Sequence, residues 1–299
     1  MHGHEADGSA QGRLVLALSI TFAALVVEIW GAMWTGSLAL LADAGHMLSD
    51  VAALSIALAA AWFAGRPHTW SSTFGLHRTE VLAATGNAVG VLLIAAFVVW
   101  SGIARLREPT AVDGEGLAAI AAIGLAANLA VLLVLHAGRS GQRLSVNLRA
   151  ARLHVLADLG GSVAAVAAGL IVALTGWERA DALLSLVIVA LIGVTALRLL
   201  GETLHVLMER APPGTDLRDV QESLETLPSV RRAHEMHCWT ISGSFVSFAC
   251  HLELEPDADP LAAIEAATSL LRDRYDLHHV TIQPEGPAAV HVHDAPLGS

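Results

Sequence analysis

Long, almost uninterrupted apolar runs fill the chain from Leu14 to about Leu207. A helix needs about 20 apolar residues to cross the hydrocarbon core of a bilayer. Six runs reach that length, and short polar connections separate them. They lie at Leu14–Thr35, Leu38–Ala64, Glu80–Ala104, Gly116–Ala137, Leu148–Thr175 and Asp181–Val206. The pattern therefore predicts an α-helical membrane domain with six transmembrane helices over residues 14–207.

Arginine placement predicts which side of the membrane the ends of the chain occupy. Six spans leave both termini on one side, and we expect residues 1–13 to be a flexible polar segment, with no removable signal peptide. The connections on the side of the termini carry seven arginines and the opposite ones carry three. The seven are Arg13, Arg66, Arg78, Arg139, Arg143, Arg149 and Arg152, and the three are Arg105, Arg107 and Arg179. Because cytoplasmic loops are rich in basic residues, both termini are predicted to be cytoplasmic, as in a multi-pass protein of a bacterial cytoplasmic membrane.

The pattern changes from Ala211 onward, where the sequence becomes mixed, acidic and interrupted by proline. Helical spacing, strand alternation and a Ser-Gly-Ser turn predict a small cytoplasmic α+β domain over residues 212–287, followed by a flexible tail at 288–299. Its predicted elements are a helix at Thr215–Thr226 capped by Thr215, strands at Arg232–Ile241 and Phe245–Glu255, a helix at Pro260–Tyr275 and a strand at Val280–Gln283. This α-β-β-α-β order is ferredoxin- or metallochaperone-like. The domain is short, so we expect it to lean on a second copy of the chain.

Composition agrees with a membrane protein and excludes several other classes. Apolar residues make up 54% of the chain, charged residues 15%, and the mean hydropathy is +0.58. An ordinary soluble domain carries about 25% charged residues. The net charge of −11 argues against a nucleic-acid partner. Two cysteines, Cys238 and Cys250, are too few for a disulfide scaffold, and we expect both to be buried as small apolar residues.

Two His-x-x-x-Asp motifs lie inside predicted spans, where charged side chains are costly and usually mark a transport or relay site. The second span contains His46 and Asp50, and the fifth contains His154 and Asp158. Spacing of i to i+4 places each imidazole and carboxylate on one face of a helix. Two such helices facing each other would offer two nitrogens and two oxygens, a tetrahedral set that suits zinc, with cobalt and cadmium as further candidates. The alternative is two structural His–Asp pairs inside the bundle.

Other polar residues within the spans leave alternatives open. Asp43 shares a helix face with His46 and Asp50, and could be a fifth ligand, a partner that orients His46, or part of an access path. Asn87 and Asn128 are interpreted as interhelical hydrogen-bond donors, with a cation path as the alternative. For Glu28 the sequence does not separate a place in the path from a packing role.

These residues resemble the cation diffusion facilitator family, and most closely its zinc-transporting branch. The resemblance covers nearly the whole chain and rests on the stretch from Leu41 to Asp50, on the His154/Asp158 pair, on Phe74–Glu80, and on His234–Trp239 with Cys250 and His251. It implies a Zn²⁺/H⁺ antiporter that works as a homodimer by alternating access and exports metal from the cytoplasm. The implied transport site is His46, Asp50, His154 and Asp158. The connection His136–Arg149 has no histidine-rich run, unlike that of eukaryotic members.

The resemblance also implies metal binding outside the membrane. Positions like His234, His251 and Glu285 bind metal in the cytoplasmic domain of this family, where zinc could be regulatory; the alternative is polar hairpin residues that face water. His237 is either a ligand or a packing residue. His68 and His77 either form a cytoplasmic access site or are solvated loop histidines.

Linkage between metal and protons supports antiport. Zinc binds neutral imidazole and ionised carboxylate, so loading the site expels protons. No phosphate-binding G-x-x-x-x-G-K-[ST] motif suggests an ATP-driven pump, and no nucleophile–base pair outside the metal site suggests an enzyme. Two alternatives remain: a membrane metal sensor that does not transport, and a transporter of Mn²⁺ or Fe²⁺.

Overall fold

The structure is a computed structural model that describes residues 4–64, 70–136, 146–243 and 245–286. The side chains of residues 4–14, 135–136 and 146–158, and of several residues between 54 and 64, lie outside the described part. The chain forms two compact units. One contains residues 1–62 and 83–200, and the other contains residues 63–82 and 201–299.

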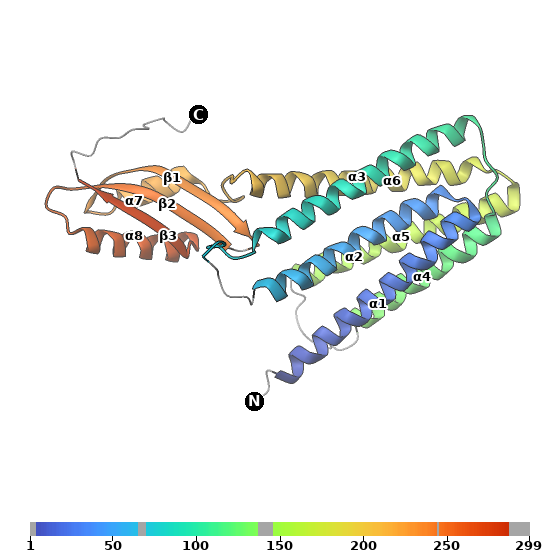
Figure 1. The fold of residues 1–299 in the computed structure, drawn as a ribbon, viewed down its shortest axis with the longest axis horizontal. Helices are drawn as coiled ribbons and strands as arrows, with labels where there is room; N and C mark the ends of the chain where they lie inside the picture. Colours follow the sequence, from blue (N-terminus) through green and yellow to red (C-terminus); the bar gives the residue numbers. More distant parts are fainter. Residues whose placement is uncertain (1–3, 65–69, 137–145, 244, 287–299) are drawn as a thin grey trace. The chain divides into compact units, whose positions relative to one another are not determined.

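Six long helices follow one another along the first two thirds of the chain (Figure 1). They are α1 (His4–Thr35), α2 (Leu38–Ala64), α3 (Arg78–Arg107), α4 (Gly114–His136), α5 (Val146–Thr175) and α6 (Arg179–Leu207). Over their described residues, α1, α3, α4 and α6 are long and apolar enough to cross a membrane. Helices α2 and α5, with 27 and 30 residues, also have spanning length. Each coincides closely with a predicted apolar run.

The start of α1 differs from the expectation of a flexible segment at residues 1–13. The helix begins at His4 and continues without interruption through Leu14 into the apolar run. Once a helix has formed, each added residue gains a hydrogen bond without a new nucleation cost. The polar residues ahead of a stable span can therefore extend it, and the hydrophobic pattern does not register this extension.

Helices α4 and α5 approach closely where glycine removes a side chain. A Cβ atom on Gly114 would lie 2.4 Å from the backbone nitrogen of Ala173, and one on Gly169 would lie 2.5 Å from that of Ala118. Helix α1 also packs on α4. Van der Waals packing between small residues replaces the hydrophobic effect as the main attraction between helices in lipid. Helix α4 therefore packs closely on both α1 and α5.

The start of α2 is held by a carboxylate from α6. Asp181 is fully buried and accepts hydrogen bonds from the Ser37 hydroxyl and from the backbone N–H groups of Leu38 and Ala39, at 2.5, 2.8 and 3.1 Å. The Arg105 guanidinium of α3 lies 3.8 Å from the same carboxylate. The first N–H groups of a helix have no partner within the helix, and a negative charge there is favourable. Asp181 therefore holds the first turn of α2, the helix that carries Asp43, His46 and Asp50.

We predict that Asp181→Asn destabilises the bundle. The substitution replaces an acceptor by an amide that presents an NH₂ group to backbone donors, and a lost buried charge-assisted bond costs about 1.5–3 kcal/mol. Thermal unfolding of the full-length protein in detergent should show a lower midpoint. Glu202→Gln, which changes an exposed acid of the same helix, is the matched control and should leave the midpoint unchanged. Equal midpoints for the two variants would contradict the role given to Asp181.

The second unit contains the small α+β domain, whose order α-β-β-α-β confirms the prediction. Its elements are α7 (Leu217–Glu225), β1 (Val230–Ser242), β2 (Phe245–Leu254), α8 (Pro260–Tyr275) and β3 (His279–Glu285). Strand β2 lies in the centre of the sheet, antiparallel to β1 and parallel to β3. The helix α7 is capped by Asp216 and not, as predicted, by Thr215. The Oδ1 atom of Asp216 accepts a hydrogen bond from the Arg218 N–H.

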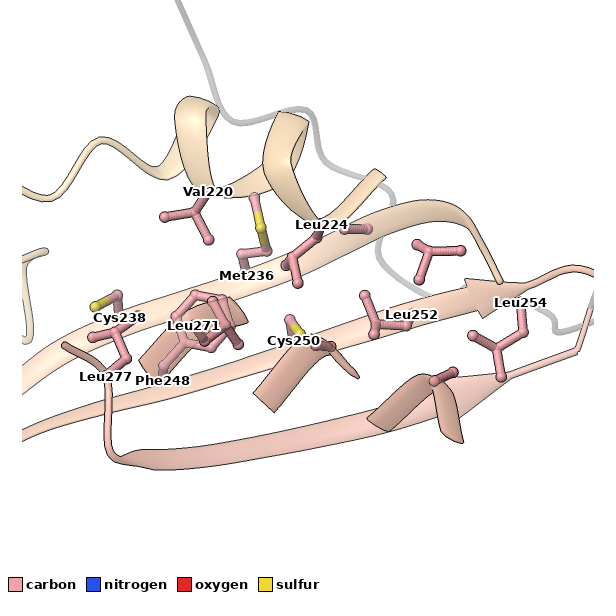
Figure 2. Packing of buried hydrophobic residues seen from close by; sticks show 14 residues of the cluster. Val220, Leu224, Met236, Cys238, Phe248, Cys250, Leu252, Leu254, Leu271 and Leu277 are labelled. Carbon is pink, nitrogen blue, oxygen red and sulfur yellow. The ribbon is translucent and has the colours of Figure 1, made fainter. Parts of the chain in front are cut away.

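One face of this sheet forms the core of the domain. Phe248, Cys250 and Leu252 of β2 are at most 1% exposed, and the helices α7 and α8 cover them with Leu224 and Leu271 (Figure 2). The alternation predicted for β2 is confirmed, because residues two apart point to the same face. The intervening residues of β2 point to the opposite face, where the helices do not pack.

Strand β1 carries an irregularity that the alternation does not predict. The pairing register shifts between His234 and His237, and Glu235 has a positive φ of 45°. Such a bulge places two residues of one strand opposite one of its partner. Ala233 and Met236, three residues apart, therefore both enter the core. His234 is directed to the other face of the sheet.

Candidate metal sites

The first half of the predicted transport site lies on α2. His46 Nε2 and Asp50 Oδ2 are 3.9 Å apart, one helical turn from each other, and both side chains are about one-fifth exposed. The spacing of i to i+4 thus brings imidazole and carboxylate together, as predicted. Both atoms are of the kind that binds zinc, and neither side chain is so buried that a metal could not reach it.

Asp43 lies on the same helix, one turn nearer the end held by Asp181. It is 5% exposed, and its Oδ1 lies 3.7 Å from the position that a Cβ of Gly161 would occupy. Gly161 belongs to α5, so the carboxylate of Asp43 points from α2 toward α5. Helices α2 and α5 therefore approach each other at this depth.

The second half of the predicted site lies on α5. His154 and Asp158 both fall within this helix, which runs from Val146 to Thr175, so their backbone spacing is helical. Asp158 precedes Gly161 by one turn and shares its face. The side chains of His154 and Asp158 lie outside the described residues. Their convergence with His46 and Asp50 stays a prediction.

Hydrogen bonds between helices brace both motifs. The Asn87 amide of α3 donates to the Ser49 hydroxyl of α2 at 3.0 Å, next to Asp50. The Asn128 amide of α4 donates to the Ser162 hydroxyl of α5 at 3.1 Å. These contacts support the interpretation of both asparagines as interhelical donors. The first bond reaches α2 at Ser49, between the two residues of its motif, and the second reaches α5 at Ser162, one turn beyond Asp158.

Glu28 of α1 is a third acidic side chain within reach of this region. It is 1% exposed, and among the described residues neither carboxylate oxygen has a hydrogen-bond partner. The charged groups that act on it are Asp43 and His46. The sequence left its role open, because a single acid within one apolar run has no local spacing to other ligands.

A second group of candidate ligands lies on the face of the small sheet opposite its core, where His234 is 6% exposed. His234 of β1 pairs directly with His251 of β2, and Glu285 ends β3 beside them. One ligand atom from each of the three lies within 4.8 Å of the others. Side chains directly opposite on neighbouring strands share a face, so the sheet register brings the two imidazoles together. The structure thus brings together the three residues that the family resemblance implied as a metal site outside the membrane.

The electrostatics of this group favour the metal-binding form of its acid. The His251 Nδ1 and Glu285 Oε1 atoms are 2.7 Å apart, and His234 Nε2 lies 3.2 Å from Oε2. Burial opposes ionisation of Glu285, but the hydrogen bond and charge of His251, with contributions from Gln283 and His234, outweigh it and lower the pKa of the carboxyl. Glu235 Oε2 lies 3.6 Å from His251 Nε2 and is a further oxygen beside the group. The alternation of β1 did not indicate Glu235, because only the bulge brings it there.

Of the remaining histidine candidates, the two that the structure describes, His77 and His237, are not part of this group. His237 is exposed on β1 and is not among the three clustered ligands. His77 contacts the ring of Phe245, with ring centres 5.6 Å apart. His68 lies outside the described residues. Among the described residues, the structure does not bring His77 or His237 into a metal-binding cluster.

Comparison with known protein families decides the class of this protein. The model of the cation efflux transmembrane domain matches residues 14–208. That of the cation efflux protein cytoplasmic domain matches residues 212–287. The chain belongs to the cation efflux, or cation diffusion facilitator, family. As a cation efflux protein it is a multi-pass membrane transporter and not an enzyme, as the sequence predicted.

Several relatives of this cation efflux protein share most of its length. Zinc transporter ZitB of Escherichia coli (strain K12) is 41% identical over 280 residues, which cover 93% of this chain and 88% of the relative. Metal cation efflux system protein CzcD of Cupriavidus metallidurans is 35% identical, with coverage of 95% and 89%. The cadmium, cobalt and zinc/H(+)-K(+) antiporter of Bacillus subtilis is 33% identical, with coverage of 98% and 94%.

A solved structure was also matched, described as the metal-bound C-terminal domain of the CzcD transporter. It is 28% identical, covers 24% of this chain and 99% of that chain, and has a TM-score of 0.23. That score is too low to support a structural argument.

The two cysteines of the cytoplasmic domain are not candidates for the metal. Cys238 and Cys250 are 4% and 1% exposed within the core of the small domain, as predicted. Burial raises the pKa of the Cys238 thiol to about 11 and that of Cys250 to about 12. Metal ligation requires the thiolate, which this environment disfavours.

We predict that both thiols resist alkylation in the folded protein. At pH 8 the raised pKa values keep the thiolate fraction low, so iodoacetamide should modify them at least about 100-fold more slowly than after unfolding. Raising the pH should speed labelling, because the thiolate fraction grows until the pH reaches the pKa. Mass spectrometry of Cys238→Ser and Cys250→Ser variants assigns the two rates. Rapid labelling of native protein at pH 8 would contradict the buried placement.

Proposed function

We propose that this cation efflux protein exports Zn²⁺ from the cytoplasm in exchange for protons by alternating access. The observation that carries the proposal is the paired imidazole and carboxylate of His46 and Asp50, on a helix whose Asp43 points toward α5. Relatives named as zinc transporters, 39–41% identical over most of the chain, support zinc as the cargo. The proposed transport site consists of His46, Asp50, His154 and Asp158.

The donor atoms explain the proposed choice of metal. Two imidazole nitrogens and two carboxylate oxygens suit a tetrahedral borderline ion such as zinc. Magnesium and calcium prefer six or more oxygens. Cadmium and cobalt accept the same donors, and a relative 33% identical is named for cadmium, cobalt and zinc. We therefore include Cd²⁺ and Co²⁺ as further cargo.

Proton exchange follows from the protonation state that the metal requires. Zinc binds neutral histidine and ionised aspartate, so binding displaces the protons that these groups carry in the empty site. On the more acidic side of the membrane, protons compete with the metal and promote its release. The site then returns with protons in place of zinc. A pH difference across the membrane can thus drive export without ATP.

We propose that both termini lie in the cytoplasm and that the functional unit is a homodimer. The arginine distribution supports the orientation. The second matched family model describes a cytoplasmic domain. Among the described residues of that domain, α7 and α8 both pack on the face of the sheet that holds the core. A second copy offers the surface that such a short domain needs.

The transport site is tested by removing one carboxylate from either helix. Asp50→Ala and Asp158→Ala should each lower zinc uptake into inverted membrane vesicles to the level of empty vesicles, because either change removes a charged ligand. Uptake of ⁶⁵Zn by equal amounts of protein measures the loss. Asp257→Ala, an exposed acid of the cytoplasmic domain, is the matched control and should transport normally. Normal uptake by either site variant would refute the assignment.

The same variants test the exchange of protons. In proteoliposomes that contain a pH-sensitive dye, zinc uptake by the unmodified protein should raise the luminal pH, because protons leave as zinc enters. Asp50→Ala should show neither uptake nor a pH change. Zinc uptake without a pH change would overturn antiport while leaving zinc transport intact.

We also propose that His234, His251 and Glu285 bind a zinc ion in the cytoplasmic domain, where it could regulate transport. The ligand atoms within 4.8 Å of one another and the lowered pKa of Glu285 support this site. Glu235 is available as a fourth oxygen ligand. Three or four donors of mixed nitrogen and oxygen type are typical of zinc in proteins.

We predict that His251→Ala removes this zinc from the full-length protein. Equilibrium dialysis in an Asp50→Ala background should show a loss of at least tenfold in the affinity of the cytoplasmic zinc, because the variant deletes a central ligand. His278→Ala is the matched control, since this histidine of the same domain is exposed and pairs with Asp276. Equal zinc affinity in the His251 and His278 variants would exclude the group as a metal site.

A further inference from the structure

The connection between α2 and α3 belongs to the same compact unit as the cytoplasmic domain, and four rings join the two. Phe245, the first residue of β2, lies at the centre of this ring cluster. Its ring centre is 6.4 Å from that of Phe74 and 5.6 Å from that of His77, both in the connection. His279, the first residue of β3, completes the cluster at 5.4 Å from Phe245 and 5.8 Å from Phe74.

The rings of this cluster meet edge to face. The ring planes of His77 and Phe245 are 87° apart, and those of Phe245 and His279 are 89° apart. Aromatic rings prefer this arrangement at centre distances of about 4.5–7 Å, because the positive edge of one ring faces the negative face of the other. The connection and the rim of the sheet therefore make a specific contact.

Hydrogen bonds tie the rings of the connection to the start of α3. The Gly75 N–H donates to the Ser72 carbonyl at 2.9 Å, which closes a turn that includes Phe74. The Leu76 carbonyl accepts from the Thr79 backbone N–H at 3.1 Å and from its hydroxyl at 2.7 Å. A displacement of the rings therefore displaces the first turn of α3. The same helix continues to the asparagine whose amide braces α2 between its two motif residues.

Strands β2 and β3 carry the cytoplasmic ligand group away from the ring cluster. His251 follows Phe245 by six residues on β2, and Glu285 follows His279 by six residues on β3. Six strand residues span about 20 Å. The two strands pair in parallel over this stretch. Because paired strands in a packed domain transmit strain, a change in their spacing at the ligand group reaches the rings.

The ring contact is shallow enough to open. Phe74 is 43% exposed, and His279 is also exposed. The ion pair of Arg78 with Glu209, which links the start of α3 to the segment after α6, is exposed as well and contributes little free energy. Elements with few buried contacts open locally at a lower free energy than the core of their domain. The connection can therefore exist in a docked and a released state.

We propose that the rim formed by Phe245 and His279 is a docking surface for residues 72–77, and that zinc in the cytoplasmic ligand group stabilises the docked state. Zinc held by ligands from β1, β2 and β3 restricts the spacing of these strands. The rings at the rim are then already ordered, so docking costs less conformational entropy. The inference rests on the proposed cytoplasmic zinc site and gives that ion an effect at the start of α3.

Hydrogen exchange tests the docking with the transport site disabled by Asp50→Ala. In this full-length protein, saturating Zn²⁺ should slow amide exchange of residues 72–80 at least threefold, because docking protects the turns. Phe245→Leu should abolish this response, since leucine keeps apolar volume but loses the ring. Trp70→Leu, which changes a fully exposed ring of the same connection, is the matched control and should keep it. A full response in Phe245→Leu would overturn the proposal.

Zinc affinity gives a second readout, which a packing defect does not reproduce. If zinc favours docking, docking favours zinc by the same factor. Phe74→Leu and Phe245→Leu should each weaken zinc binding in equilibrium dialysis by the factor by which zinc slows exchange. The double variant should lose no more than either single one, because one contact is broken in all three. Unchanged affinity, or losses that add, would contradict the proposal.

A ligand variant separates this inference from the transport function. His251→Ala should remove the exchange response of residues 72–80, and a response that persists would show that zinc acts from another site, which would overturn the proposal. If the cytoplasmic group binds no zinc, the coupling fails together with that site, while transport at the membrane site is unaffected. If the unmodified protein moves no ⁶⁵Zn but the exchange response is present, zinc export fails and the docking stands.

Discussion

Polar groups inside a bilayer must find their partners within the protein, because the hydrocarbon core provides neither water nor hydrogen-bond donors. The bundle satisfies this requirement at Asp181, which takes three donors from the start of α2 and lies beside Arg105. It satisfies it again at Asn87 and Asn128, which donate to serine hydroxyls of α2 and α5. Glu28 differs, since the described residues offer it no donor. This contrast separates side chains that hold helices together from a buried acid that has no described hydrogen-bond donor.

The hydrogen-bonded start of α2 determines where the candidate ligands of this helix lie. Asp181 fixes the helix at Leu38, and the helical period then places Asp43, His46 and Asp50 on one face. The hydrogen bond from Asn87 to Ser49 braces the helix beside the last of these residues. A helix that holds these three residues at a fixed spacing suits the proposed alternating access, because helices can move as units around a site.

The small domain shows how a strand irregularity creates a site. In a regular β1, Glu235 would lie on the same face as Ala233, which is the core face. Met236 and Cys238 would then face away from the core. The bulge at Glu235 restores Met236 and Cys238 to the core, and it leaves His234 opposite His251 on the other face of the sheet. Hydrophobic packing on one face thereby stabilises the arrangement of candidate ligands on the other. The pairing register of β1 and β2 therefore determines both the core and the grouping of the candidate metal ligands.

Much of the fold was predictable from the local periodicity of the sequence. Apolar run length predicted the six helices, i to i+4 spacing predicted the His46–Asp50 contact, and alternation predicted the core face of β2, since each depends only on residues close in the chain. The longer start of α1 and the cap at Asp216 were missed because helix ends depend on small differences between adjacent candidates. The cap from Asp181 and the grouping around His234 emerged only in three dimensions. They join residues far apart in the chain, and their meeting depends on helix packing and strand register, which no local pattern encodes.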